Sequence, residues 1–196
     1  MRTLVVFSHP RQDKSKVNKA WLEELSNHDV TLHNLDLEYA DRPFDHEHEK
    51  ALLEGHDRIV FQFPFYWYSV PAFFKKWMDD ILEPGWAFGP GGEALKGKEL
   101  VVATTIGGPE LSYQVGNYNN FTLSEFLKPL HQTANLTQMN FLSPFKVFES
   151  VVLSEEQVQE SAKAYVNHIL DPDLDPAIVY AKYLKELEAG YEGLKE

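Results

Sequence analysis

The chain has 196 residues, a length that suits one domain with a sizeable buried core. It contains no cysteine, which excludes disulfides, thiolate catalysis and cysteine-ligated zinc or iron–sulfur sites. The formal net charge of −12 at pH 7 argues against a nucleic-acid partner, because phosphate backbones are bound by basic surfaces. Any phosphate-bearing ligand must therefore be held by a local group of donors against the overall field.

The start of the chain and its most apolar window predict a cytoplasmic protein. The N-terminus passes directly into the strand-like run Thr3–Phe7, without the basic segment, apolar stretch and cleavage site of a signal peptide. The most apolar window, residues 59–74, is too short to span a bilayer and is interrupted by polar residues and by Pro64 and Pro71.

Strand-like and helix-like segments alternate along the chain. Short apolar runs predict strands at Thr3–Ser8, Val30–Leu35, Arg58–Pro64, Leu100–Thr105 and Phe145–Phe148. Amphipathic spacing and capping residues predict helices at Ser15–Ser26, at Glu47–Glu54, between Ser69 and Gly85, after Thr122, after Ser154 and from Asp175 to Gly190. Pro129 is expected to kink or end the helix that follows Thr122, and Gly190 to end the last helix. The alternation implies one parallel sheet with helices on both faces.

Ligands of such sheets bind beyond the carboxyl ends of the strands, so the loops after the first, third and fourth strands are the candidate sites. In the first loop, a helix that begins near Ser15 would present the backbone amides of residues 16–18 to a phosphate. Ser15, Asn18 and His9 would add side-chain donors. The alternative is that Ser15 is only a helix cap and His9 a surface residue.

The second and third loops offer a ring platform and a flexible backbone. Residues 63–71 hold five aromatic side chains within six positions and two prolines, which suits a planar ligand or an aromatic cluster that closes the core. In residues 104–110, Gly107 and Gly108 let the backbone approach a ligand, although a tight turn would explain them equally well.

Two further patterns are rejected. Residues 92–98 fit G-x-x-x-x-G-K, but Glu99 follows in place of Ser or Thr, and the segment precedes a strand. The acidic, histidine-rich residues 45–49 do not form a H-E-x-x-H metal motif and are interpreted as a solvated helix start. No metal site is predicted.

Together the three loops resemble the NAD(P)H dehydrogenase (quinone) family of flavodoxin-like proteins, and especially its short bacterial members known as general stress protein 14 or as potassium-efflux ancillary proteins. The matching stretches are Val5–Asn18, Asp57–Gly89, Leu95–Tyr113 and Gly116–Phe145. The resemblance implies a flavodoxin-like, five-stranded parallel sheet of order 2-1-3-4-5 within a single domain, residues 1–196. It also implies a homodimer, in which a second subunit completes each site.

The same resemblance implies a flavin and the residues that contact it. The cofactor-binding residues would be His9, Ser15, Val17, Asn18, Pro64, Phe65, Trp67, Tyr68, Thr105, Ile106, Gly107 and Gly108. Tyr113 would lie near the N1–C2 carbonyl edge and stabilise negative charge there. Other members place a histidine six residues after this tyrosine, where the present chain has Asn119, so a histidine role is not carried over. The short C-terminus favours FMN over FAD.

The implied function is NAD(P)H:quinone oxidoreduction by a ping-pong hydride transfer, with NAD(P)H as co-substrate and a quinone as acceptor. One alternative is a regulatory ancillary subunit of a glutathione-gated potassium efflux system, which would have a membrane transporter as partner. Another is a single-electron carrier, although the loop from His9 to Asn18 is longer than that of true flavodoxins.

Overall fold

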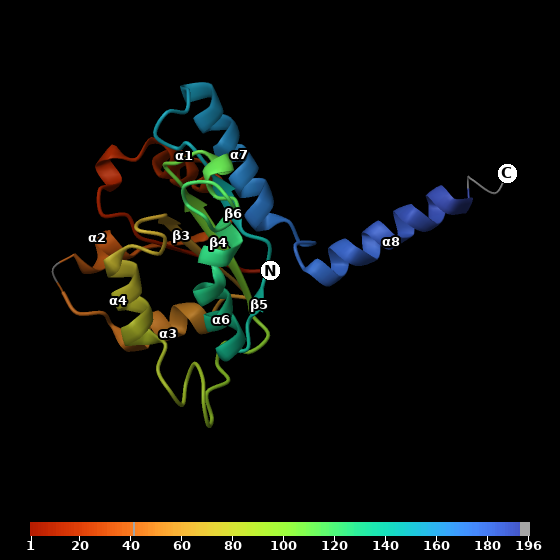
Figure 1. Cartoon of the computed structure of the whole chain (residues 1–196). Helices are drawn as coiled ribbons and strands as arrows, with labels where there is room; N and C mark the ends of the chain where they lie inside the picture. Colours follow the sequence, from red (N-terminus) through yellow and green to blue (C-terminus); the bar gives the residue numbers. More distant parts are fainter. Residues whose placement is uncertain (41, 193–196) are drawn as a thin grey trace.

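The computed structural model describes residues 1–40 and 42–192, and it has an α/β architecture with helices on both faces of one parallel sheet (Figure 1). The strands are β1 (Thr3–Phe7), β2 (Thr31–Asn34), β3 (Arg58–Pro64), β4 (Glu99–Thr105), β5 (Asn140–Phe141) and β6 (Phe145–Val147). The strand order β2-β1-β3-β4-β5 agrees with the expected flavodoxin-like order. The single domain 1–196 stays a prediction, and its positions 41 and 193–196 lie outside the described residues.

The fifth sheet position is filled by two short strands, β5 and β6, which both pair with β4, so that the sheet has six strands. Leu100 pairs with Phe141, but Ala103 pairs with Phe145, so the register shifts by one residue between the two strands. Pro144 lies in this gap and has no N–H to donate to the neighbouring strand. The sequence predicted only the second of the two segments.

Alternate residues of the buried strands face two separate hydrophobic cores. Leu4 and Val6 of β1 face one core, whereas Val5 faces the other. Helices α1 (Lys16–Leu25) and α7 (Glu155–Leu170) cover the core that contains Val5. The opposite core is covered by α2 (Leu35–Tyr39), α3 (His46–Glu54), α4 (Ala72–Ile81), α5 (Leu123–Phe126) and α6 (Lys128–Leu136). The two short 3₁₀ turns are η1 (Gln12–Lys14) and η2 (Glu110–Ser112).

Two local predictions need correction. Pro129 does mark a break after α5, but the chain continues at once as α6, in whose first turn a proline is tolerated. Gly190 does not end the last helix, because α8 runs over Pro176–Glu192. Helix α2 was not predicted. No helix in the described ranges is both long enough and apolar enough to cross a membrane.

Glu49 corrects the interpretation of residues 45–49 as a solvated helix start, because its side chain is buried. Its carboxylate accepts hydrogen bonds from Tyr39 (2.6 Å) and Trp77 (2.7 Å), and it contacts His33 Nε2 at 2.7 Å. His48 lies nearby, with its ring nitrogen within 4.8 Å of the other two ligand-type atoms. The carboxylate therefore ties β2, α2, α3 and α4 together on one face of the sheet.

The Glu49 carboxyl has an environment that favours its charged form. Burial alone raises the pKa of Glu49, but hydrogen bonds from His33, Tyr39 and Trp77 outweigh that effect and hold the pKa below its ordinary value. A depressed folded-state pKa stabilises the fold above the pKa of the unfolded chain, and this stabilisation is lost as the pH falls through the folded-state pKa.

We therefore expect Glu49→Gln to lower the free energy of unfolding by about 2–4 kcal/mol at pH 7. The substitution replaces one accepting carboxylate oxygen with an NH₂ group, which would then face another hydrogen-bond donor. The difference from wild type should shrink as the pH is lowered below 4.5, the ordinary pKa of this carboxyl. Urea unfolding at several pH values measures both effects. Glu47→Gln, at an exposed position of the same helix, is the control, and an equal loss in both variants contradicts this account.

Candidate cofactor site

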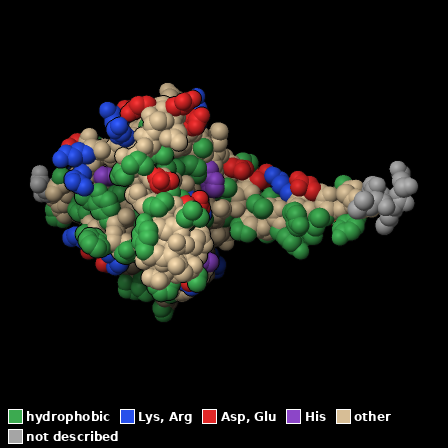
Figure 2. Space-filling model, turned by 45° about the horizontal axis from the view of Figure 1, so that its top comes forward, with side chains coloured by type: hydrophobic (Ala, Val, Ile, Leu, Met, Phe, Trp, Pro, Cys, Tyr) green, Lys and Arg blue, Asp and Glu red, His purple; other side chains and the backbone are tan. Residues whose placement is uncertain are grey.

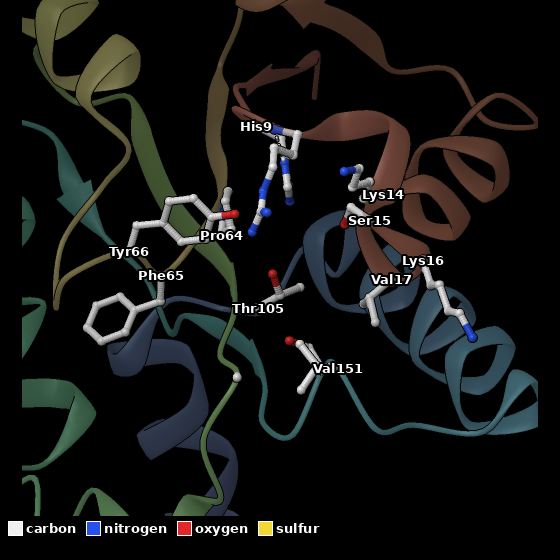
Figure 3. Close-up of a pocket in the computed structure, with 13 residues that line it drawn as sticks. His9, Lys14, Ser15, Lys16, Val17, Pro64, Phe65, Tyr66, Thr105 and Val151 are labelled. Carbon is white, nitrogen blue, oxygen red and sulfur yellow. Dashed lines mark hydrogen bonds between the residues drawn. The ribbon is translucent and has the colours of Figure 1, made fainter.

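A cavity of about 380 Å³ opens at the carboxyl ends of β1, β3 and β4 (Figure 3). This is the edge of the sheet where the sequence predicted a ligand. Its lining residues come from the three predicted loops and from a fourth segment after β6, and they are His9, Arg11, Lys14, Ser15, Lys16, Val17, Pro64, Phe65, Tyr66, Thr105, Gly107, Ser150 and Val151.

A chain of buried side-chain hydrogen bonds runs beneath the cavity. Tyr165 of α7 donates to Gln62 Oε1 (2.8 Å), and Gln62 Nε2 donates to Asn18 Oδ1 (3.1 Å). Asn18 Nδ2 then donates to Thr105 Oγ1 (3.0 Å) and to Ser15 Oγ (3.2 Å). Because both hydroxyl oxygens accept from Asn18, their own protons remain available to donate into the cavity. We call these five side chains the amide relay.

The N-terminus of α1 adds backbone donors to the same wall. Ser15 caps this helix by accepting from the Asn18 amide at 3.3 Å. The amides of Lys16 and Val17 stand in the first turn, where no intrahelical acceptor exists for them. Together with the helix dipole, these amides and the two hydroxyls are the kind of donors that an anion requires.

His9 is held in one tautomer by its own loop. The Arg11 amide donates to His9 Nδ1 (3.0 Å), so a neutral ring carries its proton on Nε2. Burial lowers the pKa of His9, although Asp36 opposes this shift, and the ring is therefore neutral at pH 7. The His9 amide donates to Asp36 (2.8 Å), which fixes the residue against α2. His9 thus offers Nε2–H as a neutral donor at the cavity.

Three cations at the cavity were not predicted from the sequence. Arg11, Lys14 and Lys16 all line it in a protein with a net charge of −12. Lys16 pairs with Glu155 at 3.2 Å and extends away from the cavity in Figure 3, whereas Arg11 and Lys14 have no acidic partner within 4 Å in the described part of the chain. The sequence did contain a signal for them, because all three basic residues lie after the predicted first strand and no later than the first turn of the next helix. Arg11 and Lys14 therefore bring positive charge to the cavity, while Asp13 and Asp36 bring negative charge to the surroundings of His9.

The aromatic loop after β3 is a tight hairpin with a strained tip. Tyr66 and Ser69 exchange two backbone hydrogen bonds, of 3.1 and 3.0 Å. Between them, Trp67 and Tyr68 have φ values of 49° and 64°, the pattern of a type I′ turn that usually needs Gly or Asn. Such strain costs roughly 1–3 kcal/mol per residue and collects at functional sites. Trp67 is 93% exposed at the tip.

Hydrogen bonds also position the glycine loop after β4. The Ile106 amide donates to Val147 (2.8 Å), while Glu149 and Ser150 donate to the carbonyls of Gly108 and Ile106. Within the described residues, the amides of Gly107 and Gly108 donate to no protein acceptor. Both remain available to a ligand's polar edge.

Tyr113 lies in an aromatic cluster beside this loop, with Phe65, Phe126 and Phe148 around its ring. Burial raises the pKa of its hydroxyl, and Tyr68 and Tyr118 add to the shift, so the group stays protonated at neutral pH. Asn119, the residue at the expected histidine position, accepts from Tyr68 (3.1 Å) and donates to Ser112 (2.8 Å).

The structure brings most of the predicted residues to one sheet edge, in two groups. The cavity itself is lined by His9, Ser15, Val17, Pro64, Phe65, Thr105 and Gly107. Asn18 lies beneath it in the amide relay. Outside the lining stand Trp67, Tyr68, Ile106, Gly108 and Tyr113. Sequence reasoning missed Arg11, Lys14, Ser150 and Val151, and it predicted only the amide of Lys16 and only the general aromatic loop that contains Tyr66.

The sequence model of the flavodoxin-like fold matches residues 1–169. The chain belongs to this family. It is 48% identical over 190 residues to YdeQ of Bacillus subtilis, named an uncharacterized NAD(P)H oxidoreductase, with 96% of each chain covered. It is 37% identical over 172 residues to KefG of Cronobacter sakazakii, named a glutathione-regulated potassium-efflux system ancillary protein, which covers 87% of this chain and 94% of KefG.

Solved structures give the same fold. General stress protein 14 of Treponema denticola, solved in complex with FMN, superposes with a TM-score of 0.82 at 32% identity, covering 86% of this chain and 98% of that one. An NADPH-quinone reductase from P. pentosaceus gives 0.80 at 34% identity, covering 87% and 99%. A structure described as a thermophilic tryptophan halogenase gives 0.83 at 42% identity, covering 86% and 98%. The names of these similar proteins thus span more than one reaction.

Proposed function

We propose that this protein is an FMN-dependent NAD(P)H:quinone oxidoreductase. The observation that carries the proposal is the cluster of phosphate-type donors at one sheet edge of an acidic protein, beside an aromatic hairpin and two free glycine amides. A similar chain named an NADPH-quinone reductase and another that holds FMN support the same reaction.

The phosphate of FMN would be held by the first loop. Ser15 and Thr105 offer hydroxyl protons, the first turn of α1 offers amides, and His9 offers Nε2–H. Arg11 and Lys14 supply the positive charge. Charge-assisted hydrogen bonds of this kind are about twice as strong as neutral ones. The choice of FMN is supported by the similar structure that was solved in complex with FMN.

The isoalloxazine ring would lie against the second and third loops. FMN, when bound, supplies a carrier that accepts hydride from NAD(P)H and gives it to a quinone in a ping-pong cycle. Pro64, Phe65, Trp67 and Tyr68 would form the wall on which the ring stacks, and Thr105 and Ile106 its floor.

The polar edge of the ring would face donors that need no rearrangement. The Gly107 and Gly108 amides have no acceptor among the described residues, and burial keeps Tyr113 protonated. Donors fixed in place stabilise charge as it develops at that edge. None of these residues acts as a nucleophile, consistent with a chain that contains no cysteine.

A homodimer is part of this proposal. The loops around the aromatic hairpin expose large apolar side chains, namely Trp67 (93%), Leu111 (76%), Val115 (81%), Tyr118 (72%) and Phe121 (55%). Exposed groups of this kind mark interfaces or ligand sites. A second subunit over this face would complete the wall on which NAD(P)H and the quinone bind.

The similarity to KefG supports one alternative, a regulatory subunit of a potassium efflux system. Purified protein separates the two functions. The enzyme must turn over NAD(P)H and a quinone unaided, whereas a purely regulatory subunit would bind FMN with negligible turnover.

The phosphate donors make a specific prediction about flavin choice. We expect the purified protein to carry one FMN per chain and to bind FMN at least 100-fold more tightly than riboflavin, a difference of about 2.7 kcal/mol. Fluorescence titration of the apoprotein with FMN, riboflavin and FAD measures this. Equal affinities for FMN and riboflavin would contradict the proposed phosphate site. Tighter binding of FAD would overturn the choice of cofactor.

Tyr113→Phe tests the donor at the polar edge. We expect flavin reduction by NADPH to slow roughly tenfold, or about 1.4 kcal/mol, because Gly107 and Gly108 share the charge. FMN affinity should stay unchanged, and stopped-flow absorbance measures the rate. An unchanged rate in Tyr113→Phe removes this hydroxyl from the chemistry.

A further inference from the structure

Helix α8 leaves the body of the protein and projects away from it (Figure 1). Every residue from 176 to 191 is exposed, including large apolar side chains such as Tyr180 (60%) and Tyr191 (63%). The family match ends at residue 169, so this helix is not part of the flavodoxin-like fold. The match to YdeQ covers 190 residues and must therefore include most of α8.

The direction of α8 is fixed by the segment that precedes it. Buried Arg58 donates to the carbonyl oxygens of Ile169 and Asp171, both at 2.7 Å, and Leu174 is buried in the core beneath α7. Asp175 then caps α8 by accepting from the Ala177 amide at 2.7 Å. These contacts fix the segment that leads into the helix, and the described part of the chain leaves the apolar side of α8 exposed.

One side of α8 carries an apolar stripe whose residue types and spacings are the same from either end of the helix. Tyr180, Leu184, Leu187 and Tyr191 follow one another at spacings of four, three and four residues. Figure 2 shows apolar side chains along one side of the arm and charged ones along the other. In an antiparallel pair centred between Leu184 and Leu187, each Tyr180 meets Tyr191 of the second helix and each Leu184 meets Leu187. A stripe with this symmetry is complementary to itself, as a two-fold interface requires.

We propose that α8 is an arm that pairs antiparallel with α8 of a second copy of this chain. A groove of about 390 Å³ at the base of the arm, lined by residues that include Leu174, Val179 and Tyr180, would receive Tyr191 of the second copy. Complete burial of the stripe and its neighbours on both helices removes on the order of 1,000 Å² from water, enough for a specific contact.

Gly190 supports this packing. It lies inside α8, where glycine costs about 1 kcal/mol relative to alanine, and a Cβ at this position would touch nothing within the chain. In the antiparallel pair Gly190 falls level with Ala181 of the second helix, about 3 Å along the axis from Tyr183, so its missing side chain gives that ring room. A membrane surface is a weaker candidate for covering the stripe of α8, since anionic lipids repel a chain with a net charge of −12.

Engineered disulfides test the pairing directly, because the natural chain has no cysteine. Full-length Tyr180→Cys, carrying an affinity tag, is mixed with untagged Tyr191→Cys and oxidised. We expect the mixed disulfide to form at least tenfold more than either like-with-like product, because equivalent positions 180 lie about 16 Å apart along antiparallel helices. The control pair is Lys182→Cys with Ala189→Cys, at the same level of the helix but on its opposite side, and it should not cross-link.

A second measurement uses the oligomeric state. Leu184→Glu with Leu187→Glu keeps good helix formers but places charge in the stripe, and it should halve the mass seen in sedimentation while FMN affinity is unchanged. The mass halves where the arm joins chains that the face around Trp67 does not join; where both contacts join the same two chains, the mass stays and the double variant must instead lose the mixed disulfide between positions 180 and 191. Cross-linking of Tyr180→Cys with itself, a mixed product no greater than in the control pair, or a mixed disulfide that persists at an unchanged mass in the double variant overturns the proposal.

Discussion

The amide relay beneath the cavity is the interaction on which the candidate site depends. It joins α7 to α1 through β3 and then joins α1 to β4, and every side chain in it except Ser15 is buried. Because Tyr165 donates first, each amide of Gln62 and Asn18 is oriented to accept on one side and donate on the other. The relay therefore delivers two hydroxyl protons, from Ser15 and Thr105, to the cavity. A chain of hydrogen bonds in a low-dielectric interior polarises each member and strengthens the donors at its end.

This relay explains how an acidic protein can hold an anion. The overall charge of −12 repels a phosphate at long range, but solvent and salt screen that repulsion over about 10 Å. The cavity is lined by hydroxyls, helix amides, a neutral His9 and the cations Arg11 and Lys14, with Asp13 and Asp36 near His9. In the proposed site these donors would contact the phosphate at hydrogen-bond distance, where screening is weakest.

The sequence predicted the elements of the site better than their contacts. The loops after three parallel strands meet at one edge because of sheet topology alone, so His9, Phe65 and Gly107 could be assigned to a common site. The pattern of Gly92 to Lys98 was correctly set aside, since those residues lie in turns before β4 and away from the cavity.

Contacts between distant segments could not be predicted in the same way. Asn18 was expected to face a phosphate, whereas its partners are Gln62 and Thr105, which lie 44 and 87 residues away. Glutamate is a residue type that usually lies at the surface, and only the packing of Tyr39 and Trp77 around Glu49 reveals a buried carboxylate. Gly190 has the local signature of a helix end, but the helical residues around it continue to Glu192.

The affinity of Asn18→Asp for FMN tests the central claim most directly. A carboxylate at this position would accept from Gln62, Ser15 and Thr105, which turns both hydroxyl protons away from the cavity and adds a negative charge beneath it. The account predicts that FMN binds about 100-fold more weakly, roughly 2.7 kcal/mol, while riboflavin, which lacks the phosphate, loses much less. Asn27→Asp, an exposed change of the same charge beyond the far end of α1, should leave both affinities unaltered. FMN binding by folded Asn18→Asp within threefold of wild type would contradict the account.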